Sequence, residues 1–202
     1  SYKSSVRDLS FRSGMKFTAS ENWFTEFGIQ CSLLSMIPNE SHNSTNPVQN
    51  RTRPVNSFES AIYADNKLIL KDILSITPGF RISNYLTSGF SDLSFEPRLN
   101  ADILLTKNLS ISFSYMRVSQ YSHLVFTTGS IMNNEVWIPA GKKIPPAKSD
   151  QVTAGWSGSF FNGKFSSELS FYYKDMYNLS SYKDGYTSLM GDENWISKVE
   201  TG

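Results

Sequence analysis

Ionisable side chains at two-residue spacing are the feature of this sequence best placed to do chemistry. Glu96 and Arg98 stand two positions apart, and Asp102 has the same parity. Paired carboxylates carry the acid–base chemistry of glycoside hydrolases. Acids and bases on one face of a sheet more often form ion pairs across neighbouring strands. We expect this structural role, and no enzyme, for a set that faces one side of a sheet: Glu26, Asp65, Arg81, Glu96, Arg98, Asp102 and Glu168.

Metal-ligating residues are few and widely spaced. The chain has two histidines, His42 and His123, and one cysteine, Cys31, which therefore cannot form a disulfide within the chain. A zinc site needs three or four converging ligands, and no spacing supplies them. Acids between positions 184 and 193 could bind Ca²⁺ with loop carbonyls, but solvated loop acids are the simpler interpretation. We expect no metal and no cofactor.

The stretch from Ser122 to Ser149 is long and is expected to begin and end near strand ends, which suits it to ligand contact. Trp137 can stack on a sugar or another planar surface, while Lys142 and Lys143 can meet anionic groups. The alternative is a loop that only shields its surroundings. The predicted ligand-contacting set is Tyr121, His123, Trp137, Lys142 and Lys143. Basic residues are otherwise scattered and the net charge is +1, so we expect no nucleic-acid partner.

Strands must position these side chains. From Leu93 to Leu105, apolar and polar residues alternate over about thirteen positions, roughly twice a typical soluble strand. Pro97 cannot donate to a ladder, which predicts a bulge or local break. The same alternation recurs over 8–17, 23–33, 58–70, 74–83, 109–115, 151–160 and 164–174. It is weaker over 58–70 than over the other ranges. We therefore predict about eight strands in an all-β fold.

The connections alternate between short and long. Short turns are expected at 20–22, 71–72, 107–108 and 162–163, where Asn162-Gly163 is a strong hairpin signal. Longer links are expected at Pro38 to Ser57, Leu86 to Asp92, and Ser122 to Ser149, with another from Asn178 onward. Tight turns on one side and long loops on the other are typical of outer-membrane barrels.

A barrel wall explains the pattern better than a soluble β-sandwich, which also alternates. The strands have the length that a tilted strand needs to cross hydrocarbon. Aromatic residues recur near strand ends, as in interfacial girdles: Trp23, Tyr85, Tyr115, Tyr121, Tyr173 and Tyr177. If the short turns lie on the periplasmic side, the first strand begins on the outer side of the membrane and the eighth strand ends there. This favours antiparallel transmembrane wall strands from a larger barrel over a small closed one.

Several local patterns resemble the TonB-dependent receptor family, in the version common in Bacteroidetes-type bacteria. Phe58 to Asn66 resembles the family strand that precedes a Pro-Gly-x-Arg segment, here Pro78 to Arg81. Phe95 to Leu99 is similar to its x-x-Pro-Arg-Leu strand. The later matches are 114–117, 120–124, 137–139, 145–146, 149–152 and 172–178. The order and spacing of these patterns hold over most of the chain.

The resemblance implies an active importer in the outer membrane. Family members close 22 strands around an N-terminal plug, bind a nutrient outside and use TonB to release it. Residues 1–202 lack the plug, the TonB box, the closing strands and the usual terminal aromatic, so we expect a partial barrel domain. The implied partners are outer-membrane lipid, TonB through the missing plug, a nutrient ligand and in some members a surface lipoprotein. Rival functions are a carbohydrate-binding sandwich and a passive structural barrel.

Overall fold

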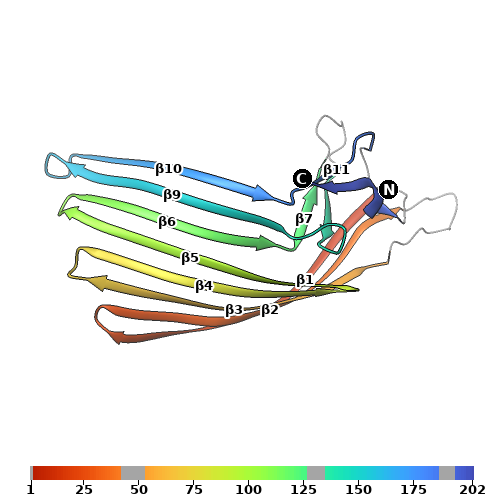
Figure 1. Ribbon diagram of the computed structural model, residues 1–202, viewed down its shortest axis with the longest axis horizontal. Coiled ribbons are helices and arrows are strands. Elements are labelled where there is room, and N and C mark those ends of the chain that lie inside the picture. Colours follow the sequence, from red (N-terminus) through yellow and green to blue (C-terminus); the bar gives the residue numbers. More distant parts are fainter. Residues whose placement is uncertain (1, 42–52, 127–134, 187–193) are drawn as a thin grey trace.

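The computed structural model describes residues 2–41, 53–126, 135–186 and 194–202. Eight long strands form one antiparallel sheet in the order β1-β2-β3-β4-β5-β6-β9-β10 (Figure 1). Their bounds are β1 Tyr2–Ser20, β2 Trp23–Ser41, β3 Val55–Leu70, β4 Leu74–Thr87, β5 Phe90–Thr106, β6 Leu109–Gln120, β9 Ala147–Phe160 and β10 Phe165–Tyr177. The prediction of an all-β meander of about eight strands is confirmed.

The strands are long enough to cross a bilayer. β6 has 12 residues and β1 and β2 have 19 each, so several strands exceed the predicted lengths. At about 3.3 Å per residue, β6 alone spans roughly 40 Å, or roughly 30 Å after the tilt usual in barrels. Within the described ranges, no helix has the length and apolar character to span a membrane.

Tight turns gather at one end of the sheet. They join β1 to β2, β3 to β4, β5 to β6 and β9 to β10, all at the left of Figure 1. Lys71 and Asp72 take left-handed φ values of 52° and 55° in the β3–β4 turn. The β9–β10 turn is wider than predicted, because Phe161 is also left-handed (φ 52°) and the connection includes residues 161–164.

The predicted long link from Leu86 to Asp92 is wrong. β4 runs to Thr87, β5 begins at Phe90, and these two residues pair directly. Gly89 supplies the left-handed φ of 74° that closes the turn. A tight turn therefore also occurs at the opposite end of the sheet, and short and long connections do not alternate strictly.

Prolines interrupt the ladders locally. The β5–β6 pairing ends at Arg98 and Met116, one residue short of Pro97, whereas the β4–β5 pairing continues through Pro97. The β3–β4 pairing likewise stops at Asp65 with Gly79 and resumes beyond Pro78. A proline nitrogen has no hydrogen to donate. The local break expected at Pro97 therefore occurs on one side of β5.

The sheet has one apolar and one polar face. On the apolar face Leu9, Leu93 and Phe171 are 72%, 71% and 68% exposed. A soluble sandwich would bury such side chains under a second sheet, whereas a barrel wall presents them to hydrocarbon. Cys31 lies on this face and is half-buried.

Two of the residues assigned to aromatic girdles do not lie in one. Trp23, Tyr173 and Tyr177 are exposed near strand ends, as a girdle requires. Tyr85 and Tyr121 are only 0% and 3% exposed and stack against each other. Strand-end position alone could not distinguish the two groups. The alternation does separate Tyr85 from the girdle, because it places Tyr85 with Arg81 and Ser83 on the polar face.

Candidate functional site

The polar face, which we call the inner wall, carries ionisable side chains in rows across β1 to β5. The register places Lys16 opposite Glu26, Glu26 opposite Asp65, Asp65 opposite Gly79 and Gly79 opposite Arg98. Directly opposite residues share one face of a sheet, so these positions lie in line. Lys16 and Glu26 form an ion pair at 3.4 Å that is largely exposed and therefore weak.

Asp65 and Arg98 join two strands that are not neighbours. Arg98 Nε and Nη2 donate to the two carboxylate oxygens of Asp65 at 2.6 and 2.7 Å. Gly79 lies between them on β4, and a Cβ there would collide with the Asp65 carboxylate. The missing side chain therefore leaves room for a bidentate bridge between β3 and β5, a strong form of charge-assisted hydrogen bond.

Arg81 is the centre of a second network. Its Nη1 donates to Gln30 Oε1 at 3.0 Å, its Nη2 to Glu59 Oε1 at 3.1 Å, and its Nε to Ser83 Oγ at 3.0 Å. Ser83 in turn donates to Glu96 Oε1 at 2.5 Å. Glu96 is only 6% exposed. Its burial is offset by the Ser83 hydroxyl and by the nearby guanidinium, so the network cross-links β2 to β5.

Tyr63 covers two glycines of the inner wall. A Cβ on Gly28 would lie 2.6 Å from the Tyr63 hydroxyl, and one on Gly14 would lie 2.7 Å from it. Arg12 and Arg98 lie over the Tyr63 ring, at 5.2 and 5.9 Å from its centroid. An aromatic ring laid over glycines restores the packing that they lack and fixes the register.

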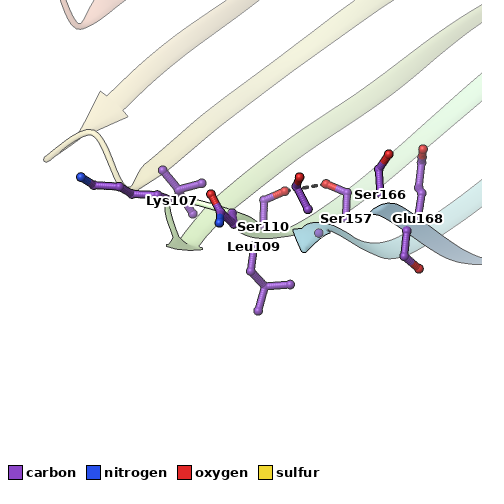
Figure 2. A pocket seen from close by; sticks show the side chains of 11 residues that line it. Lys107, Leu109, Ser110, Ser157, Ser166 and Glu168 are labelled. Atoms are coloured by element: carbon purple, nitrogen blue, oxygen red, sulfur yellow. Dashed lines mark hydrogen bonds between the residues drawn. The ribbon is translucent and has the colours of Figure 1, made fainter. Parts of the chain in front are cut away.

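The inner wall of β6, β9 and β10 is lined by small hydroxyls instead. Ser110 and Ser157 hydrogen-bond at 2.8 Å, beside a hollow of about 510 Å³ near the tight turns (Figure 2). Glu168 pairs with Ser157 in the register, so its side chain lies on the same face of the sheet. Neither Glu168 nor Asp102 forms an ion pair among the described residues, so the structure does not bring these two into the networks above.

A compact unit stands at the outer end of the sheet. We call it the outer cap, and define it as the described residues of 121–146 and 178–202. It contains β7 Ser122–Val125, β8 Val136–Pro139, β11 Ser180–Tyr182, the 3₁₀ helix η1 Trp195–Lys198 and β12 Val199–Thr201. β7 pairs with β8 and β11 with β12. The two hairpins share one apolar core: Val125, Val136, Ile138, Ile144, Trp195 and Val199.

Tyrosines attach the outer cap to the wall. The rings of Tyr85 on β4 and Tyr121 stack at 4.6 Å between centroids and 2° between planes. Tyr85 donates to the Ala140 carbonyl at 3.2 Å, and the Ala140 amide donates to the Tyr121 carbonyl at 2.8 Å. Burial, and then the Asp92 carboxylate, raise the pKa of the Tyr121 phenol well above its ordinary value. β8 also contacts β1 and β2.

His123 connects the two hairpins of the outer cap. It is 4% exposed, and its Nδ1 lies 2.9 Å from the Ser180 hydroxyl. Burial lowers the pKa of His123, and the Pro145 backbone opposes that shift. The lowered pKa favours the neutral form of the side chain. Among the described residues, no group of three or more His, Cys, Asp or Glu side chains could hold a metal ion.

The predicted ligand-contacting residues all belong to the outer cap, but they differ in exposure. Trp137 is 39% exposed, and Lys142 and Lys143 are exposed. Tyr121 and His123 are buried inside the cap and its attachment. Of the five, only Trp137, Lys142 and Lys143 present their side chains to a ligand that approaches the cap from solvent.

Sequence reasoning missed the partners that organise both regions. Gln30, Ser83 and Tyr63 organise the inner wall, and Tyr85 with Ala140 fixes the cap. The pair Gly14 and Gly28 was an available signal, because two glycines on one face leave space for a large ring. The tyrosine stack had no comparable signal, since its members lie on segments that are not neighbours in the sheet.

The apolar outer face, the polar inner wall and the meander topology define the wall of a transmembrane β-barrel. The family model described as "TonB dependent receptor-like, beta-barrel" matches residues 2–195. The chain belongs to the β-barrel of the TonB-dependent receptor family. Members of this family are outer-membrane receptors that transport and are not enzymes, and the outer membrane is the location of this chain.

Solved structures show the same fold at low sequence identity. The FrpB iron transporter from Neisseria meningitidis has 10% identity and a TM-score of 0.66, with 93% of this chain and 30% of that chain covered. The siderophore receptor PirA from Pseudomonas aeruginosa has 15% identity and a TM-score of 0.65, with 94% of this chain and 35% of that chain covered. The alcaligin outer-membrane receptor FauA from Bordetella pertussis has 17% identity and a TM-score of 0.52, with 92% of this chain and 32% of that chain covered. The chain thus spans about a third of these receptors, and no curated protein matches it.

Proposed function

We propose that this chain is part of a receptor that imports a scarce or bulky nutrient across the outer membrane with energy from TonB. The observation that supports the proposal is the eight-stranded wall matched to one receptor family over residues 2–195. The polar inner wall suits a water-filled or plugged lumen, and the apolar face suits lipid. A passive barrel would have the same faces, so dependence on energy must be tested.

The substrate class within this proposal is an iron chelate, an oligosaccharide or a peptide. The solved receptors named above are an iron transporter, a siderophore receptor and an alcaligin receptor, which makes a ferric chelate the first substrate to test. We retain the Bacteroidetes-type version of the family as a proposal, based on the local motifs from Phe58 onward.

The proposed partners follow from this architecture. The relatives are about three times as long as this chain, which supports a parent with a plug domain and further strands closing a 22-stranded barrel around residues 1–202. TonB would act through the plug. Outer-membrane lipid would cover the apolar face, and a surface lipoprotein is a further proposed partner above the outer cap.

Uptake by the full-length receptor is the direct test. Cells that express it would be given a panel of ferric chelates, oligosaccharides and peptides, with and without an intact TonB gene. The proposal predicts accumulation of one class that stops when TonB is deleted. Accumulation that continues at the same rate without TonB would support a passive barrel instead.

Ligand contact is proposed for Trp137, Lys142 and Lys143, with Tyr121 and His123 supporting them from inside the cap. Replacing Trp137 with Ala should weaken binding of the transported ligand about tenfold, because a stacking surface is lost. Phe126, which is 62% exposed in the same connection, is a matched control for the loss of an exposed aromatic ring. Titration calorimetry on the full-length receptor measures both variants, and equal affinities for Trp137→Ala and wild type would contradict the assignment.

A further inference from the structure

The apolar face of the wall carries a hollow of about 430 Å³ on strands β1 to β4. The side chains that line it from this face are Met15, Phe27, Ile29, Ile62, Ala64 and Phe80. In the register, Ala64 on β3 lies between Phe27 on β2 and Phe80 on β4. Directly opposite residues share one face of a sheet. A methyl group between two phenyl rings therefore lowers the surface at Ala64 and makes it the floor of the hollow.

The inner wall holds this floor in place from the opposite face. Gly14 and Gly28 border the hollow with their backbones, since they have no side chains. Tyr63 covers both glycines on the inner wall, where a Cβ on either one would meet its hydroxyl. A site whose walls are fixed before a ligand arrives loses less freedom when the ligand binds. The hollow is therefore a preformed feature of the wall.

A polar side chain, Asn66, follows Ala64 on the apolar face and lies closer to the tight turns. Its Oδ1 accepts hydrogen bonds from Thr25 Oγ1 at 2.8 Å and from Trp23 Nε1 at 3.5 Å. Its amide nitrogen, which carries two N–H groups, has no hydrogen-bond partner among the described residues. The β3–β4 pairing is also interrupted here, beside the exposed Pro78. Unsatisfied donors are costly in hydrocarbon, so the Asn66 amide favours an acceptor that the membrane supplies.

The depths of Asn66 and of the hollow match one phospholipid leaflet. Asn66 lies four residues from Leu70, where β3 ends at the tight turns. This separation is ~13 Å along the strand and roughly 10 Å along the membrane normal. With the turns at the surface of a headgroup region roughly 6 Å deep, Asn66 lies near the ester carbonyls. Trp23, which contacts Asn66, is a residue type that prefers this level. The hollow lies further from the turns, where the acyl chains are.

We propose that the hollow over Ala64 and the Asn66 amide form a binding site for one phospholipid from the leaflet on the side of the tight turns. An acyl chain fills the hollow between the Phe27 and Phe80 rings, and Asn66 Nδ2 donates to an ester carbonyl of the same lipid. Lipid covers the whole apolar face, but a preformed hollow with a hydrogen-bond donor at its end binds one molecule more tightly than the rest of the face does. The site depends on the outer-membrane location of the chain and not on the import proposed above.

Native mass spectrometry of the full-length receptor, titrated in detergent with dioleoyl phosphatidylethanolamine, tests the site. The wild-type receptor should bind one lipid molecule more tightly than all later ones. Ala64→Phe should weaken the binding of that molecule about tenfold, because the added ring fills the hollow. Ala101→Phe is the matched control, since Ala101 lies on the same face between Ile76 and Phe113 and does not line the hollow. Heat-modifiable migration on gels checks that each variant assembles.

Asn66→Leu tests the hydrogen-bond donor separately, and it serves as the test if Ala64→Phe does not assemble. It should weaken binding of the first lipid about fivefold, because one hydrogen bond is lost. Equal binding by the wild type, Ala64→Phe and Asn66→Leu would overturn the site. An equal loss in Ala101→Phe would also overturn it, because the bound lipid would then lie elsewhere on the face. So would a receptor dimer that Ala64→Phe separates, because a second copy of the protein would then fill the hollow.

Discussion

The inner wall and the outer cap are stabilised by different physics, although one chain forms both. The wall takes its geometry from ladders, and its polar side chains are satisfied by partners one or two strands away, as in the Asp65–Arg98 bridge across Gly79. The cap takes its geometry from an apolar core that joins β8 to η1, about sixty residues later in the chain. The wall should therefore tolerate loss of the cap, whereas the cap has little structure without its core.

The largest effect should come from Trp195→Ala in the cap core. Trp195 is 6% exposed, and truncating a buried Trp costs roughly 3–5 kcal/mol. The cap should become sensitive to protease while the barrel still assembles, as judged by heat-modifiable migration on gels. If the barrel also fails to assemble, the wall and the cap are not separate units.

Gly28→Ala should disturb the wall and leave the cap intact. Its Cβ would meet the Tyr63 hydroxyl and the Ser13 carbonyl oxygen, and overpacking of this kind costs roughly 1–3 kcal/mol. The matched control is Gly141→Ala in the cap, where a Cβ meets nothing within 4 Å. Denaturant unfolding of the full-length barrel measures both. Equal stabilities for the two variants would show that Tyr63 does not fix the register.

Arg98→Met tests the bidentate bridge. Removing the guanidinium leaves Asp65 without its partner, and because both side chains are partly exposed the loss should be about 1–2 kcal/mol. The double variant with Asp65→Asn should recover part of that loss, since no unpaired charge remains. A cycle in which the two losses simply add would mean that the bridge contributes no coupling energy.

The smallest effect should be a pH dependence confined to the cap. The pKa of His123 is lowered in the folded cap, so the folded state binds fewer protons than the unfolded one. Its contribution to cap stability is complete above the unfolded pKa of about 6.5 and falls as the pH decreases below that value, by at most about 1.4 kcal/mol per pH unit. Protease sensitivity of the cap at pH 7.5 and pH 5.5 measures it. His123→Gln should flatten the difference, and an unchanged difference in that variant would assign it to another group.

Alternation predicted the wall well because a strand exposes its faces with a period of two, which is a local property. The strand order, the tight turn at Lys71-Asp72 and the break at Pro97 all follow from residues within a few positions of each other. The connection at Leu86 to Asp92 was predicted too long, because Asn84 takes an apolar position of β4 and Phe90 a polar position of β5, so the alternation breaks off although the strands still pair. The networks around Arg81 required knowledge of the register between strands.

The sequence alone determined the strands, their two faces, the antiparallel meander and the resemblance to a receptor family. The tertiary structure alone decided that Asp65 reaches Arg98 across Gly79, that Asp102 and Glu168 stay outside the networks, and that Tyr121 and His123 are buried in a cap. The reason is the range of the interactions. Face and turn are set by neighbours in the chain, whereas a cap core and a tyrosine stack depend on contacts between segments tens of residues apart, which no local period encodes.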